Sequence, residues 1–151
     1  MYNLELVNAI KDKLIYQQQT VAVAESVTAG HLQAALSLAE NASLFFQGGL
    51  TAYNLGQKCR HLDIDPVKAG ACDSVSMGIA EDMARNICAF FVCDWGIGIT
   101  GYATTVPEKS INSLFAYFAI FFRKKLILSG KIESEIKNAM DVQVFYTHEV
   151  L

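Results

Sequence analysis

The chain has 151 residues, of which 52% are hydrophobic and 18% are charged, and its formal net charge at pH 7 is −3. This length suits one domain with a sizeable core, and this composition excludes an intrinsically disordered chain. The negative charge gives no electrostatic basis for binding nucleic acid, and no apolar run reaches the ~18 residues of a membrane-spanning helix. We therefore expect a single domain over residues 1–151, with neither nucleic acid nor a membrane as partner.

The four cysteines show neither Cys-x-x-Cys spacing nor an accompanying histidine pair at zinc-ligand spacing. No secretory signal is evident at the N-terminus, so reduced, structural thiols in a cytoplasmic protein are the simpler interpretation. Because Cys88 falls within a predicted helix and Cys93 at its end, we do not expect them to share a metal-binding face. We predict no bound metal and no cofactor.

Helical and strand patterns alternate in the first half of the chain. Apolar residues at i, i+3, i+4 spacing mark the helices, and short apolar runs mark the strands. In chain order, the patterns predict a helix over 2–18, a strand over 21–24, a helix over 31–39, a glycine-interrupted strand over 44–53 and a short helix from 54.

In the second half, residues 61–71 contain Pro66 and read as a loop with one helical turn. The remaining patterns predict a helix opened by Ser76, a strand over 94–101, an aromatic β-hairpin over 112–122 and 126–128, and a final helix over 131–150 with Ser129 as candidate N-cap. Interleaved helices and strands predict a three-layer α/β/α sandwich. The hairpin makes its mostly parallel sheet mixed.

The turn Glu25-Ser26-Val27-Thr28-Ala29-Gly30 lies between a strand and a helix, where α/β proteins hold ligands. Thr28 is a candidate N-cap, and free amides of the Thr28–Gly30 turn would favour an anion or an oxyanion. Ser26 is the candidate nucleophile. The local pattern also leaves open that Ser26 and Thr28 only cap the helix, as serine and threonine commonly do.

This turn resembles the Glu-Ser-Cys-Thr-Gly-Gly signature of the CinA C-terminal domain, the competence/damage-inducible family, with Val27 and Ala29 as replacements. Further similar segments extend the resemblance from Glu25 to about Glu108. The matching positions are Ser43, Phe46, Gly48, Gly49, Tyr53 and Lys58 in one segment, Ser74–Ser76 at a helix start, and Thr100, Gly101 and Ala103 after the strand over 94–101.

Active members of this family are nicotinamide mononucleotide deamidases, so the resemblance implies an amidohydrolase with Ser26 as nucleophile and Lys58 as base. In isolation Lys58 reads as a surface lysine, whereas a lysine in a partly dry pocket loses proton affinity and can act as a base. We therefore expect the two side chains to approach each other in the fold. The resemblance further implies a small-molecule nucleotide partner, a homo-oligomer, and substrate-binding roles for Thr28, Gly30, Ser43, Tyr53, Thr100 and Gly101.

Three departures from the family pattern leave open a non-catalytic binding or regulatory domain. The glycine-rich loop after Thr100 is shortened and carries threonines, Asn54 and Leu55 replace a Ser-Asn pair, and the paired arginines near the last helix are missing. Lys131 and Lys137 are the nearest cations, so we expect weak binding of phosphorylated substrates. A third hypothesis is a subunit that assembles through its aromatic hairpin.

Overall fold

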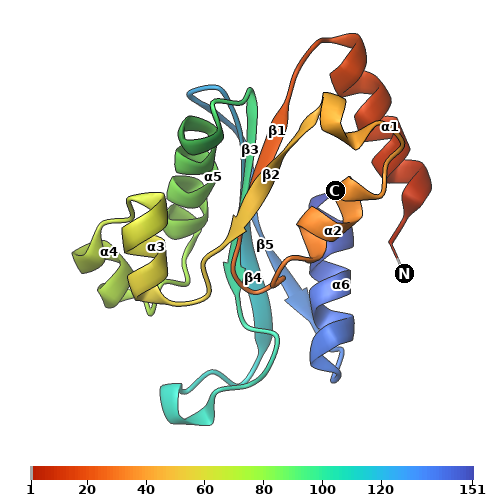
Figure 1. Ribbon diagram of the computed structural model, residues 1–151. Helices are drawn as coiled ribbons and strands as arrows, with labels where there is room; N and C mark the ends of the chain where they lie inside the picture. Colours follow the sequence, from red (N-terminus) through yellow and green to blue (C-terminus); the bar gives the residue numbers. More distant parts are fainter. Residues whose placement is uncertain (1) are drawn as a thin grey trace.

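The computed structural model, which describes residues 2–151, has a five-stranded sheet between two layers of helices (Figure 1). The strands are β1 (Val21–Glu25), β2 (Phe46–Thr51), β3 (Trp95–Gly101), β4 (Leu114–Phe122) and β5 (Lys125–Ser134). Their order is β2-β1-β3-β4-β5, in which β1 pairs in parallel with β2 and β3, and β4 pairs antiparallel with β3 and β5. The predicted α/β/α sandwich with a mixed sheet is confirmed.

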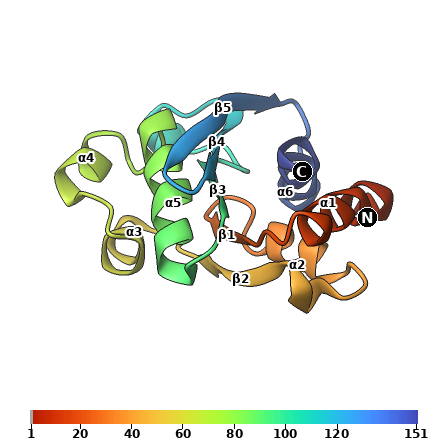
Figure 2. The same ribbon diagram turned by 90° about the horizontal axis from the view of Figure 1, so that it is seen from above.

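The helices divide between the two faces of the sheet. They are α1 (Leu4–Tyr16), α2 (His31–Ser37), α3 (Leu55–Leu62), α4 (Pro66–Ala71), α5 (Met77–Phe91) and α6 (Ala139–Val150), with short 3-10 turns η1 (Ala42–Leu44) and η2 (Pro107–Lys109). Figure 2 shows α1, α2 and α6 on one face and α3, α4 and α5 on the other. No helix among residues 2–151 has the length and apolar character needed to cross a membrane.

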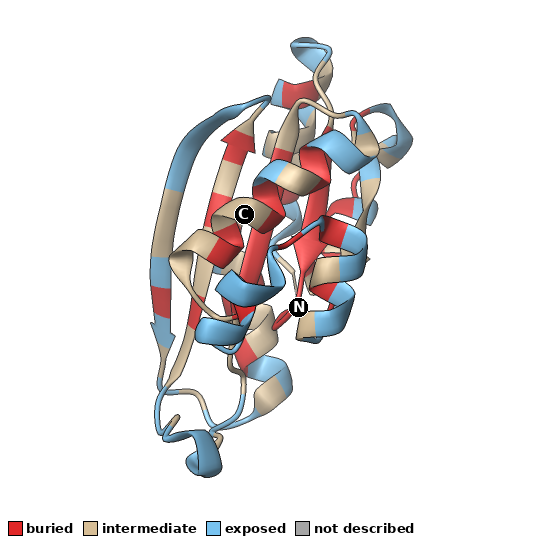
Figure 3. Ribbon diagram, turned by 90° about the vertical axis from the view of Figure 1, so that its left-hand side faces the viewer, coloured by how far each residue is buried: buried red, intermediate tan, exposed pale blue. Residues whose placement is uncertain are grey.

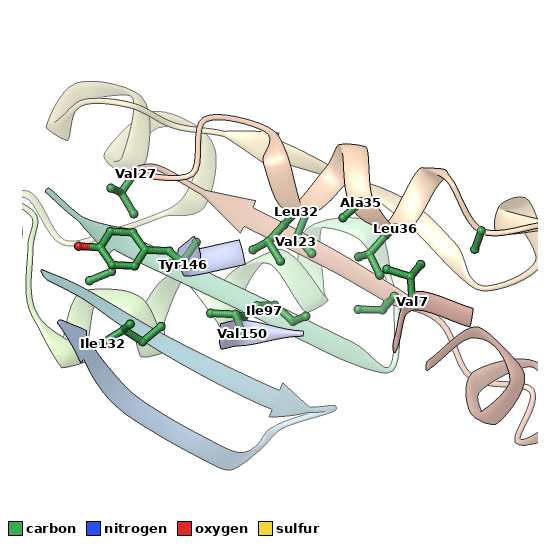
Figure 4. Packing of buried hydrophobic residues seen from close by; sticks show 14 of the residues in the cluster. Val7, Val23, Val27, Leu32, Ala35, Leu36, Ile97, Ile132, Tyr146 and Val150 are labelled. Atoms are coloured by element: carbon green, nitrogen blue, oxygen red, sulfur yellow. The ribbon is translucent and has the colours of Figure 1, made fainter. Parts of the chain in front are cut away.

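The larger core lies between the sheet and the layer formed by α1, α2 and α6. Val23 and Ile97 on the sheet belong to one buried cluster with Leu32 on α2 and Tyr146 on α6, and Figure 4 shows Val23 beside Leu32. Burial is concentrated on the central strands, which are sandwiched between the helices, whereas β5 is largely exposed at the edge (Figure 3). Packing on both faces of the central strands thus fixes the position of their carboxyl ends, where a ligand-binding site can form.

Helix α5 packs unusually closely on β3 because two strand residues lack side chains. A Cβ atom added to Gly96 would lie 2.1 Å from the Ala84 carbonyl oxygen, and one added to Gly98 would lie 2.4 Å from the Ala80 carbonyl oxygen. Both distances are far below normal contact, so any side chain would push the helix off the strand. This contact fixes the start of α5 relative to the end of β3.

The final helix begins later than the sequence pattern predicts. Residues 131–134 belong to β5, where Lys131 pairs with Tyr117 of β4, and Ser129 donates its hydroxyl to Glu81 instead of capping a helix. Helix α6 begins only after Asn138, whose side chain accepts from two amides of its first turn. The period-four pattern was misleading because Ile132 on the strand and the apolar face of α6 bury into the same core.

Residues 61–71 are more helical than a loop with one turn. Helix α3 continues to Leu62, and the Asp65 side chain then caps α4 by accepting from the amides of Val67 and Lys68. Pro66 occupies the first turn of α4, where a missing N–H costs nothing.

Candidate active site

A cavity of ≈ 460 Å³ opens at the carboxyl ends of β1 and β3. It is bounded by the turn after β1, α3, the connection from α4 to α5, the loop after β3, and the start of α6. Its lining consists of Ser26, Val27, Tyr53, Asn54, Leu55, Lys58, Asp73, Ser74, Val75, Gly101, Tyr102, Ala103, Thr104, Val106, Lys109, Ala139 and Gln143.

The structure brings Ser26 and Lys58 together at the floor of this cavity. Ser26 follows β1 directly, and its backbone N–H donates to the Ile99 carbonyl of β3 over 3.1 Å. Lys58 comes from α3, which starts one turn earlier with Asn54 as its side-chain cap. The Lys58 Nζ and Ser26 Oγ atoms are 3.0 Å apart, and both residues are buried. The expected approach of these two side chains is confirmed.

Burial changes the proton affinity of Lys58. Desolvation lowers the pKa of its amine from 10.5 to about 8, although the negative charge of Asp73 raises that pKa in part. At pH 7 such an amine is neutral in roughly a tenth of the molecules, whereas fewer than about one in a thousand ordinary lysines are neutral. A neutral amine beside the Ser26 hydroxyl can accept its proton.

The side chain of Glu25, rather than that of Thr28, accepts hydrogen bonds from the free backbone amides at the start of α2. The fully buried Glu25 carboxylate accepts from the amides of Gly30, Leu32 and Gln33 over 3.1, 3.0 and 2.8 Å. The prediction that Thr28 caps this helix is wrong, because the charged carboxylate makes stronger bonds to these amides than a hydroxyl would. The Gly30 amide is therefore not free to hold an oxyanion.

Two other amides of the same turn are free for that task. Among the described residues, the backbone N–H groups of Val27 and Thr28 have no hydrogen-bond partner, whereas the Ala29 amide donates to the Ser26 carbonyl. Val27 lines the cavity, and its own carbonyl accepts from Gln143 of α6. The amides directly after Ser26 are therefore the ones that could bind a developing negative charge.

A charged cluster that the sequence analysis did not identify forms the rim of the cavity. Asp73 accepts from the Tyr102 hydroxyl over 2.9 Å and from Lys109 Nζ over 2.9 and 2.8 Å to its two oxygens. These hydrogen bonds, chiefly that from Lys109, lower the pKa of Asp73 despite partial burial. Tyr102 and Lys109 lie on the connection from β3 to β4, whereas Asp73 lies on the connection from α4 to α5. No local sequence pattern therefore signals their meeting.

Next to Asp73, Ser74 presents an unused polar group to the cavity. Its hydroxyl oxygen is buried and has no hydrogen-bond partner among the described residues. Both Asp73 and Ser74 have left-handed backbone, with φ of 51° and 60°. The Thr100 hydroxyl donates to the Ser74 carbonyl over 2.8 Å and so holds this connection against the end of β3.

The other residues implied by the family resemblance are divided between the cavity and the rest of the fold. Tyr53 lines the mouth, with 68% of its surface exposed, and Gly101 lines the wall at the end of β3. Three residues lie near this end of the sheet without lining the cavity: Thr28, Gly30 and Thr100. Ser43 is exposed in η1, which precedes β2 at the opposite end of the strands. The geometry therefore gives Ser43 no part in this cavity.

Helix α6 contributes uncharged residues, Ala139 and Gln143, to the cavity. Lys131 forms an ion pair with Glu133 on the edge strand. Lys137 instead lines a neighbouring cavity that shares Ala103 and Thr104 with the first. Neither lysine that the sequence offered as a phosphate ligand lines the cavity that holds Ser26.

Among residues 2–151, no three histidine, cysteine, aspartate or glutamate side chains are grouped so that they could hold a metal ion. The cavity itself presents hydroxyls, two lysine amines, the Asp73 carboxylate and the free amides described above.

The fold and the cavity together define an α/β protein with a ligand site at the carboxyl ends of its central strands. Comparison with known sequences is more specific: the profile of the CinA C-terminal domain matches residues 3–142. The chain belongs to this family.

Relatives and solved structures agree with this assignment. Protein MG115 of Mycoplasma genitalium is 34% identical over 146 residues, covering 95% of this chain and 91% of that protein. A CinA-like protein of Synechocystis is 39% identical over 104 residues, which cover 67% of this chain. The crystal structure of a CinA superfamily protein from Enterobacter cloacae is 26% identical, with a TM-score of 0.91, and the match covers 99% of this chain and 89% of that one.

The chain spans about a quarter of the length of several CinA-like relatives, including the 25% it matches in the Synechocystis protein. A structure from Klebsiella pneumoniae, described as competence damage-inducible protein A, shares the fold with a TM-score of 0.92 at 22% identity.

Proposed function

We propose that this protein is an amidohydrolase that converts a pyridine nucleotide carboxamide, such as nicotinamide mononucleotide, to the acid and ammonia. The observation that supports this most strongly is the 3.0 Å contact between Ser26 Oγ and a buried Lys58 amine in an accessible cavity. The substrate class comes from the family resemblance, because the cavity alone does not specify a pyridine ring.

In the proposed reaction, neutral Lys58 accepts the proton of Ser26 as the hydroxyl oxygen attacks the carboxamide carbon. The amides of Val27 and Thr28 stabilise the negative charge on the carbonyl oxygen. The Lys58 ammonium then protonates the departing nitrogen, which leaves as ammonia. Lys58 next takes a proton from water as the oxygen of that water attacks the carbonyl carbon of the Ser26 ester. The Lys58 ammonium then returns this proton to the departing Ser26 oxygen, which releases the acid and restores the neutral amine and the hydroxyl.

The test is ammonia release from nicotinamide mononucleotide by the purified chain. We expect Ser26→Ala to lose at least about 10³-fold in kcat, because removing a covalent nucleophile leaves only binding and the oxyanion site. Ser37→Ala is a matched control, since Ser37 is an exposed serine on α2 outside the cavity. Equal release by the wild type and Ser26→Ala would overturn the proposed nucleophile.

A second candidate, a nucleotide-binding domain without catalysis, is favoured by the composition of the rim. Lys109 is paired with Asp73, and α6 offers Ala139 and Gln143 where a phosphate-binding enzyme would present cations. Thermal shift with a panel of pyridine nucleotides separates the candidates, because a ligand that binds the native state raises Tm whether or not it is hydrolysed. Stabilisation without ammonia release would favour the binding domain.

We also propose that the chain forms a homo-oligomer, on the basis of the family resemblance. Analytical ultracentrifugation would test the oligomer, and a monomer at micromolar concentration would contradict it.

A further inference from the structure

The C-terminal end of α5 brings two cysteines together far from the cavity. Val92 follows the helix with left-handed backbone, φ 51°, and its amide donates to the Ala89 carbonyl over 3.3 Å. The Cys93 amide donates back to the Cys88 carbonyl over 3.1 Å. These two bonds define a Schellman motif, in which the chain reverses and the side chains at the first and last positions meet.

The two positions that meet in this motif are Cys88 and Cys93. Helical spacing would separate residues five apart, as the sequence analysis assumed, but the helix ends between them. The proximity of the two thiols raises the pKa of Cys88, which burial raises further, and lowers the pKa of Cys93. Each sulfur also contacts a carbonyl of the following segment: Cys88 Sγ lies 3.7 Å from the Asp94 oxygen, and Cys93 Sγ lies 3.1 Å from the Trp95 oxygen.

The turn that joins the two thiols is held in a conformation that its sequence disfavours. Left-handed backbone at a β-branched residue is rare and strained relative to glycine. Val92 is 90% exposed, so its side chain gains little from packing in return. The thiols therefore meet because the contacts of α5 and β3 determine this turn.

The pair is also reachable from solvent. A surface cavity of ≈ 560 Å³ is lined by both cysteines together with Arg85, Arg123 and Lys124. Asp94, which pairs with Arg123, is the carboxylate at this site. The Asp94 carboxylate raises the pKa of both thiols, whereas the three cations attract an anionic thiol reagent.

We propose that Cys88 and Cys93 form a reversible thiol–disulfide site whose oxidant is a small anionic disulfide such as glutathione disulfide. The Cys93 thiolate attacks one sulfur of the reagent, forms a mixed disulfide and releases one glutathione thiolate. Cys88 then loses its proton to solvent, and its thiolate attacks Cys93 Sγ and releases the second glutathione. The protein loses two hydrogens and two electrons, and one disulfide reagent becomes two thiols.

The experiment uses the full chain carrying Cys59→Ser and Cys72→Ser, so that only the proposed pair can react. The protein is treated with glutathione disulfide, remaining thiols are alkylated, and the product is identified by intact mass and peptide mapping. We expect a Cys88–Cys93 disulfide that forms at least about tenfold faster in the native protein than in urea, because folding holds the thiols in contact. Formation at an equal or slower rate in the native state would overturn the proposal.

Single variants define the order of the two steps. Cys88→Ser should accumulate a stable mixed disulfide on Cys93, and Cys93→Ser should leave the buried Cys88 unmodified. Trapping of glutathione on Cys88 with Cys93 untouched would contradict the assignment of Cys93 as the attacking thiol. The wild-type chain is a further control, in which a disulfide mapped to Cys59 or Cys72 in place of the pair would also contradict the proposal.

Discussion

The floor and the rim of the cavity differ in how far their charged side chains are removed from water. The floor, Ser26 and Lys58, is buried and holds an amine whose pKa is lowered by desolvation. The rim, Asp73, Tyr102 and Lys109, holds an ion pair whose two side chains are about half exposed. Desolvation therefore sets the reactivity of the Lys58 amine at the floor. The ion pair at the rim is screened by solvent and can exchange partners, so it is suited to selecting a substrate.

The largest expected effect comes from removing the amine at the floor. Lys58→Met keeps the length of the side chain and should lower kcat by about 10²–10⁴-fold, the usual contribution of a general base. Ammonia release measures this loss. A variant with wild-type kcat would show that the buried amine has no role in the reaction.

The same variant should be more stable than the wild type near neutral pH. The native pKa of Lys58 is about 8 and its ordinary value is 10.5, so the unfolded chain binds more protons between these values. Wild-type stability should rise across this pH window, and the penalty for burying the charged amine applies fully below pH 8. Urea unfolding of both proteins should show the largest difference below pH 8 and convergence above 10.5.

The next largest effect, on substrate preference, is expected when a positively charged side chain is introduced into the cavity wall. Gln143→Arg should raise the preference for nicotinamide mononucleotide over its unphosphorylated riboside by roughly tenfold or more, since a charge-assisted bond contributes about 1.5–3 kcal/mol. The wild type should show little preference. A strong wild-type preference that survives Lys131→Ala and Lys137→Ala would show that phosphate binds elsewhere.

A smaller effect is expected when the rim loses its negative charge. Asp73→Asn suits the left-handed backbone and removes the carboxylate that raises the pKa of Lys58. The pH profile of kcat/KM should shift to lower pH by up to about one unit. Lys109→Met leaves the Asp73 charge uncompensated and should shift the profile to higher pH, so shifts in the same direction would refute this coupling.

The smallest effect is on stability at the rim. Lys109→Met should change the free energy of unfolding by less than about 1 kcal/mol, because exposed ion pairs contribute little. Urea unfolding at low and high salt measures it. A larger loss, insensitive to salt, would mean that the rim has a structural role comparable to that of the floor.

Sequence patterns anticipated the floor better than the rim. Ser26 and Lys58 each follow a strand pattern, and parallel strands bring such positions to one edge of the sheet. The family resemblance was needed to single out Lys58, which in isolation has the features of a surface lysine. Asp73 and Lys109 lie on connections whose paths depend on the packing of α4, α5 and η2, which no local pattern encodes. The cluster at the rim therefore could not be predicted from the sequence and was identified only in the structure.

Two errors of prediction had the same kind of cause. Thr28 fitted the preferences of a cap, but Glu25 lies three residues earlier, and its longer charged side chain reaches the same amides. Lys131–Ser134 fitted a helical period, but the long β4 offered a partner for every one of those residues. In both places a tertiary interaction replaced the locally favoured one.

The contact between α5 and β3 also limits how this sequence can diverge. At Gly96 and Gly98 even a methyl group would meet helix backbone, whereas nothing lies within 4 Å of a Cβ added at Gly70. Chains descended from a common ancestor can thus change Gly70 freely, but they can change the two strand glycines only if the helix moves as well. A single substitution at either strand glycine is therefore not tolerated on its own. We expect the contact between α5 and β3 to persist among descendants whose cavities have diverged.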